Sequence, residues 1–86
     1  MKLKEGYILR EIAGTHVILP LRGINLDGII ALNASGVLMW RALEKGADVQ
    51  ALVDALFDEY EVSKEQAEKD VQRFLQLLLD FGCIEQ

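Results

Sequence analysis

The side chains best suited to bind another molecule lie on one flank of a helix expected over residues 64–81. Steps of three and four residues place four of them on the same side of that helix: Asp70, Arg73, Leu77 and Phe81. A carboxylate, a guanidinium and two large apolar groups lie together there, so the flank is typical neither of a core nor of a solvated face. Such a surface favours contact with another polypeptide.

Residues that could carry catalysis or hold a metal are isolated. His16 is the single histidine and Cys83 the single cysteine, so neither has a second ligand of its kind at metal-binding spacing. The carboxylates follow the spacing of solvated helix faces, and scattered glycines do not make a phosphate-binding loop. We therefore expect no catalytic residue, no metal and no cofactor, in a protein that is not an enzyme.

Length and charge narrow the class of protein. The 86 residues predict a single domain over 1–86, and the net charge is −5. Residues 33–86 hold five basic and eleven acidic side chains, which disfavours binding to nucleic acid. No stretch approaches the ~20 apolar residues of a membrane span, and the N-terminal residues lack the apolar run of a signal peptide. We expect a cytoplasmic protein with no nucleic acid or membrane partner.

The first third of the chain predicts a small antiparallel sheet that must position this surface. Residues 7–12 and 16–19 form the first two strands, joined by a tight turn at residues 13–15, where glycine accepts a positive φ. Pro20 ends the second strand because it cannot donate to a ladder. After a loop, the apolar run of residues 28–32 forms the third strand.

The rest of the chain predicts three helices, the first of them packed on the sheet. Asn33 is a good N-cap for a helix over residues 34–44, since its side-chain oxygen accepts from a free backbone N–H. Gly46 provides a left-handed C-terminal cap. Within this helix Gly36 permits close packing on the sheet, and Trp40 belongs to the core with an indole N–H that needs a partner.

Caps also mark the starts of the second and third helices. Asp48 caps a helix over residues 49–60, whose apolar positions follow the spacing of one face: Val49, Leu52, Val53, Leu56 and Phe57. Ser63 and Gln66 form a capping box, in which each side chain serves the other's backbone N–H. The third helix then runs to about Phe81.

Three segments in this order carry a resemblance that extends over nearly the whole chain. They are Leu32-Asn33-Ala34-Ser35-Gly36 leading to Trp40, the helix over 49–60, and Asp70-Val71 followed by Phe74-Leu75 and Leu78. This pattern resembles the PqqD family, the small leader-peptide-binding domains also called RiPP recognition elements. Cys83 stands where that family often has leucine.

The resemblance implies a winged helix-turn-helix-like α+β fold, with a three-stranded antiparallel sheet followed by three helices. It also implies a non-catalytic adaptor that binds the leader segment of a ribosomally made precursor peptide. The leader adds as a strand to the third strand, in a groove walled by the third helix. The complex is then presented to a modifying enzyme, often a radical SAM protein.

Strand addition suits these residues, because an edge strand leaves N–H and C=O groups unpaired for an extended peptide. We expect residues 28–32 to form the docking edge. Selectivity would come from the third helix, through apolar side chains that line a pocket and charges that fix the leader's direction. The candidate peptide-binding residues are Gly28, Ile29, Ile30, Ala31, Leu32, Asp70, Arg73, Phe74, Leu77 and Phe81.

Two other functions remain open, because a fold does not fix a function. One is a winged-helix DNA-binding protein. Its recognition helix should carry several basic residues, whereas Lys64, Lys69 and Arg73 are offset by neighbouring carboxylates. The other is a docking subunit that only assembles an enzyme complex. An exposed third-strand edge could also pair with a second copy, which would give a homodimer.

Overall fold

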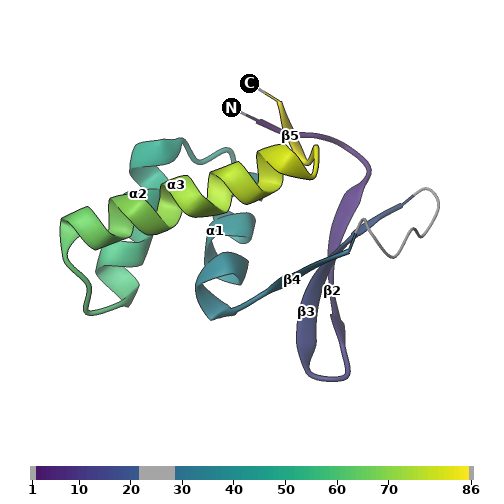
Figure 1. The fold of residues 1–86 in the computed structure, drawn as a ribbon, viewed down its shortest axis with the longest axis horizontal. Coiled ribbons are helices and arrows are strands. Elements are labelled where there is room, and N and C mark those ends of the chain that lie inside the picture. Colours follow the sequence, from purple (N-terminus) through teal and green to yellow (C-terminus); the bar gives the residue numbers. More distant parts are fainter. Residues whose placement is uncertain (1, 22–28, 86) are drawn as a thin grey trace.

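The computed structural model describes residues 2–21 and 29–85, in which three helices pack together and a β-hairpin projects from them (Figure 1). The expected α+β fold, a three-stranded antiparallel sheet followed by three helices, is confirmed. The elements in chain order are β1 Lys2–Leu3, β2 Tyr7–Ile12, β3 Thr15–Pro20, β4 Ile30–Leu32, α1 Ala34–Glu44, α2 Val49–Glu59, α3 Lys64–Asp80 and β5 Ile84–Glu85.

The main sheet is antiparallel in the order β2-β3-β4. A two-residue turn joins β2 to β3, with positive φ at both Ala13 (52°) and Gly14 (83°), as a type I′ hairpin turn requires. Thr15 therefore belongs to the strand and not to the turn. Pro20 does not stop β3 before it but is its last residue, opposite Tyr7.

The predicted bounds of α1 are confirmed. The Oδ1 atom of Asn33 accepts a hydrogen bond from the backbone N–H of Gly36 at 2.9 Å, and Gly46 follows the helix with φ 90°. Helix α2 begins where it was predicted, capped by Asp48, but ends at Glu59, one residue earlier than expected. Two cap residues therefore locate both helix starts.

Only half of the predicted capping box forms at α3. The Oγ atom of Ser63 accepts from the backbone N–H of Gln66 at 3.0 Å, as expected. The side chain of Gln66 does not reach back to Ser63; its Nε2 atom donates to Oδ1 of Asp70 at 2.8 Å. The Asp70 carboxylate accepts from the amide Nε2 one turn ahead, and this contact holds the Gln66 amide along the helix, so its Oε1 atom does not accept from the backbone N–H of Ser63.

A second, two-stranded sheet was not predicted. β1 and β5 pair antiparallel, with Lys2 opposite Glu85 and Leu3 opposite Ile84, and the N–H of Lys4 donates to the carbonyl of Cys83 at 2.8 Å. Figure 1 shows this pair beside the C-terminal end of α3. The two ends of the described chain are thus joined by backbone hydrogen bonds.

The core lies between the main sheet and the helices. Trp40 is 1% exposed, which confirms its predicted burial, but its indole N–H has no hydrogen-bond partner among the described residues. Phe57 and Val49 were expected on the apolar face of α2, yet both are exposed. The neighbouring elements cover only the middle of that face, where Leu52, Val53 and Leu56 are buried. The buried cluster comprises Ile18, Ile30, Leu32, Met39, Trp40, Leu43, Leu52, Val53, Leu56, Ala67, Val71, Phe74, Leu75, Leu78, Cys83 and Ile84.

Within the described ranges, none of the helices combines the length and apolar character needed to cross a bilayer.

Cys83 should be chemically inert in the folded protein. Its side chain is 1% exposed, and burial raises the pKa of the thiol, an effect that the nearby Lys4 ammonium only partly offsets. A raised pKa leaves less thiolate at neutral pH, and the thiolate is the reactive form. We expect native protein to react with a disulfide reagent about 100-fold more slowly than protein unfolded in urea. Equal rates in the two states would contradict this prediction.

Candidate functional site

The hairpin determines which backbone groups of the sheet are paired. In a hairpin with a two-residue turn, the flanking residues Ile12 and Thr15 exchange hydrogen bonds, and the bonded pairs then alternate along the ladder. The N–H of Leu21 donates to the carbonyl of Gly6 at 2.7 Å, and this pair falls in the same alternation. Every second residue of β2 and β3 therefore uses its backbone N–H and C=O groups within the hairpin. The backbone groups of the residues between them point away from the partner strand of the hairpin.

This alternation assigns the free backbone groups of β4. His16 and Ile18 do not bond to β2, so their N–H and C=O groups face β4, where they lie opposite Leu32 and Ile30. Ala31 lies between these two bonded pairs. Its N–H and C=O groups therefore point away from β3, toward the open edge. In the described part of the chain, no other strand pairs with β4.

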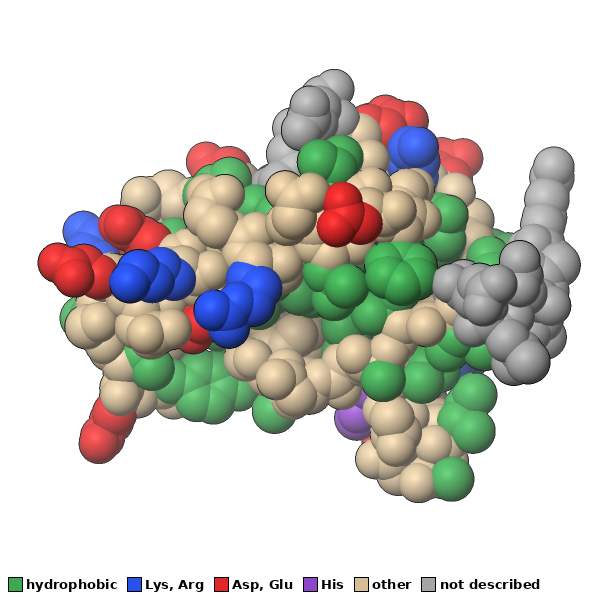
Figure 2. Space-filling model, in the orientation of Figure 1, with side chains coloured by type: hydrophobic (Ala, Val, Ile, Leu, Met, Phe, Trp, Pro, Cys, Tyr) green, Lys and Arg blue, Asp and Glu red, His purple; other side chains and the backbone are tan. Residues whose placement is uncertain are grey.

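A groove of about 560 Å³ lies beside this edge, between β4, the first turns of α1, and α3. Figure 2 shows apolar side chains gathered near the centre of this face, with charged side chains along its upper border. The groove is lined by Ala31, Leu32, Asn33, Ser35, Gly36, Met39, Asp70, Arg73, Phe74 and Leu77. Six of these ten residues are among the candidates expected from the sequence.

The wall formed by α3 has mixed polarity. Leu77 is half-buried and Phe74 is 6% exposed, so the wall offers apolar surface to an occupant while Phe74 also belongs to the core. Asp70 accepts its hydrogen bond from Gln66 and forms no ion pair with Arg73 among the described residues. The exposed guanidinium of Arg73 therefore remains available at the border of the groove.

The floor formed by α1 was not predicted as part of the site. Ser35 and Met39 line it, and the Oγ atom of Ser35 donates to Oδ1 of Asn33 at 2.9 Å. A Cβ atom on Gly36 would lie 3.2 Å from the Cβ atom of Leu32, which confirms that glycine allows α1 to start close against β4. The sequence predicted Asn33 as a cap and Gly36 as a packing residue, but it gave no separate signal that Ser35 and Met39 line the groove.

Four candidates do not line the groove. Ile30 is 5% exposed and packs in the core, and Phe81 is the C-cap of α3, exposed beyond the groove. Ile29 precedes β4, which begins at Ile30 and not at the predicted residue 28. Gly28, and with it the start of the predicted strand, lies outside the described residues.

The fold and the groove together define a class of small α+β domain, in which the open edge of a three-stranded antiparallel sheet lies beside a groove walled by α3. The chain belongs to the PqqD family: the family model described as coenzyme PQQ synthesis protein D (PqqD) matches residues 15–84. The resemblance seen in the sequence is thereby confirmed.

Two solved structures share this fold across almost their whole length. One, described as TbiB1 in complex with the TbiA(beta) leader peptide, is 29% identical, with a TM-score of 0.82 over 99% of this chain and 95% of that one. The other, lasso peptide synthetase B1 complexed with the leader peptide, is 22% identical, with a TM-score of 0.81 over 99% of this chain and 96% of that one. The second likeness shows the fold alone. No curated protein matches the chain.

Proposed function

We propose that this chain is a non-catalytic adaptor that binds the leader segment of a ribosomally made precursor peptide and presents it to a modifying enzyme. The observation that carries the proposal is the position of Ala31, whose outward N–H and C=O groups lie at the border of a partly apolar groove. A structure that is 29% identical to this chain along its length is described as a complex with a leader peptide, which supports the same occupant here.

The leader would bind in extended form as a strand added to β4. The N–H of Ala31 donates to a leader carbonyl and its C=O accepts from a leader N–H, which gives affinity with little demand on sequence. Alternate leader side chains then point into the groove, onto Met39, Phe74 and Leu77. A carboxylate on the leader would pair with the guanidinium of Arg73 and fix the direction of the strand.

The remainder of the precursor extends beyond the groove, where an enzyme can act on it. The modifying enzyme, such as a radical SAM protein, supplies the chemistry in this proposal. The adaptor raises the local concentration of the precursor at that enzyme, since a bound leader tethers the segment to be modified. In this proposal the adaptor, the precursor and the enzyme act together in the cytoplasm.

Binding of a labelled leader tests the proposal. The probes are the TbiA(beta) leader and the leaders of candidate precursor peptides, each followed by fluorescence anisotropy. We expect saturable binding of the cognate leader, with NMR shifts at β4, the first turn of α1 and residues 70–77. No binding at about 100 μM, shifts confined to α2, or tight binding to duplex DNA at low salt would contradict the proposal.

Two leucines on α3 provide a matched pair of substitutions. Leu77 lines the groove, whereas Leu79 is 37% exposed and does not. Leu77→Lys should weaken leader binding by about 20-fold, because a cation replaces apolar contact area, and Leu79→Lys should change it less than about twofold. Anisotropy titrations of both variants, with urea unfolding to compare their stabilities, check this prediction. Equal losses for the two variants would place the leader elsewhere.

A further inference from the structure

β2 forms the opposite edge of the main sheet. Among the described residues, no strand pairs with its outer side. By the hydrogen-bond alternation of the hairpin, the backbone N–H and C=O groups of Tyr7, Leu9 and Glu11 point away from β3, toward the open edge. A side-chain contact supports this assignment, since the guanidinium of Arg10 reaches the carbonyl of Leu9 at 3.4 Å. That length is near the limit of a hydrogen bond, so an incoming N–H can displace the guanidinium. β2 thus offers a longer open edge than β4.

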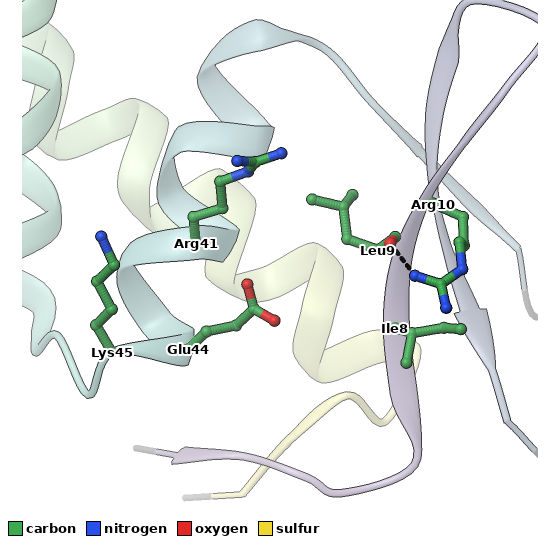
Figure 3. A pocket seen from close by; sticks show the side chains of 6 residues that line it. All are labelled: Ile8, Leu9, Arg10, Arg41, Glu44 and Lys45. Atoms are coloured by element: carbon green, nitrogen blue, oxygen red, sulfur yellow. Dashed lines mark hydrogen bonds between the residues drawn. The ribbon is translucent and has the colours of Figure 1, made fainter.

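A cleft lies between this edge and the C-terminal half of α1. Figure 3 shows Arg41 and Glu44 extending from α1 toward β2, and the side chain of Leu9 extending toward the helix. The cleft is lined by Ile8, Leu9, Arg10, Arg41, Glu44 and Lys45. An added strand along β2 would therefore run beside charged side chains of α1, as one along β4 would run beside α3.

The charge of this cleft is opposite to that of the whole chain. Three cations and one carboxylate line it, in a protein whose net charge is −5. None of the four charged groups forms an ion pair with another described residue. The cations of α3 form no ion pair among the described residues either, but Lys64, Lys69 and Arg73 alternate along the helix with carboxylates, which lowers the net positive charge there. An acidic segment would be repelled by most of this protein and attracted to the cleft beside β2.

We propose that the β2 edge and its basic cleft form a second docking surface, which binds an extended, acidic segment of the modifying enzyme. The identity of this occupant rests on the proposed adaptor function. β3 separates the two open edges, so a leader on β4 and an enzyme segment on β2 can be bound at the same time. A second copy of this chain is a poor occupant, because pairing two β2 edges would bring two basic clefts together.

An acidic β-forming peptide tests the surface without the enzyme. The probe is a blocked ten-residue peptide of alternating Glu and Val, titrated into isotope-labelled protein at low salt. We expect NMR shifts at residues 7–12 and at Arg41 that diminish as salt is added. The same peptide with alternating Lys and Val, and one N-methylated at each Val, should bind at least about fivefold more weakly. Equal binding of the three peptides, or shifts confined to the β4 groove, would overturn the proposal.

Paired charge removals then test the enzyme as occupant. Arg41→Gln with Lys45→Gln removes two cations of the cleft, and Lys64→Gln with Lys69→Gln removes two from α3 as the control. Calorimetry with the purified enzyme that modifies the leader-bound precursor should show about fivefold weaker binding for the first variant only, with leader binding unchanged in both. Equal enzyme binding by both variants, or self-association of the wild type through β2, would overturn the proposal. A leader that fails to bind would instead contradict the adaptor function and leave the peptide result on β2 intact.

Discussion

Replacing Ala31 with proline is expected to abolish leader binding while leaving the fold intact. The N–H of Ala31 points away from β3, so proline removes the donor that the leader needs without breaking a bond of the sheet. The pyrrolidine ring also occupies the space into which that N–H pointed. Ile30, which precedes it, already has the extended backbone that a residue before proline favours. The loss of one hydrogen bond together with steric exclusion should weaken binding by about 100-fold or more.

Two further proline variants make this test specific to the edge. Glu11→Pro has the same geometry on the opposite edge, because Glu11 also points its N–H outward, and it should leave leader binding unchanged. Ile30→Pro removes an N–H that bonds to β3, so it should lower the stability to urea as well as the affinity. Anisotropy and circular dichroism of the three variants separate these outcomes. If Ala31→Pro is folded and binds the leader as tightly as wild type, β4 is not the docking edge.

Trp40→Ala should cause the largest loss of stability. Trp40 is 1% exposed at the centre of the core, and truncation of a buried aromatic side chain costs about 3–5 kcal/mol. Domains are stable by only about 5–15 kcal/mol, and one of this size has a modest core. The unpartnered indole N–H moderates the loss, since its removal relieves a desolvation penalty of about 1–3 kcal/mol.

Urea unfolding followed by circular dichroism measures this effect. Phe57→Ala serves as the control, because Phe57 is an aromatic residue that is 52% exposed on α2, and its truncation should cost less than about 1 kcal/mol. A loss for Trp40→Ala no greater than that for Phe57→Ala would mean that Trp40 does not support the core.

Local signals account for the parts of the fold that the sequence predicted. Asn33, Asp48 and Ser63 each accept from a backbone N–H of the helix that follows, so the start of each helix is decided within four residues of chain. Gly14 likewise indicated the hairpin, although the positive φ of Ala13 is not signalled by its residue type and the turn proved one residue shorter than predicted. Interactions of this range can be recognised from residue type and spacing.

The parts that the sequence missed depend on residues far apart in the chain. β1 and β5 each have two residues, which carry no periodicity, and the residues that pair are separated by almost the whole chain. Ser35 and Met39 line the groove because the packing of α1 turns them toward α3, which helical spacing alone does not determine. Gln66 shows that two local interactions can compete within one helix. Its side-chain amide donates to Asp70, whereas the capping motif predicted that it would accept from the backbone N–H of Ser63.

The pairing of β1 with β5 has a consequence for how the domain can be connected to other proteins. Because Lys2 lies opposite Glu85, a short linker can join the two ends, and circular permutation need not disturb the packing of the helices. For the same reason the domain can be inserted into a surface loop of an enzyme, because the two linkers to the enzyme would start from neighbouring positions at β1 and β5. The two open strand edges would keep their orientation in either arrangement.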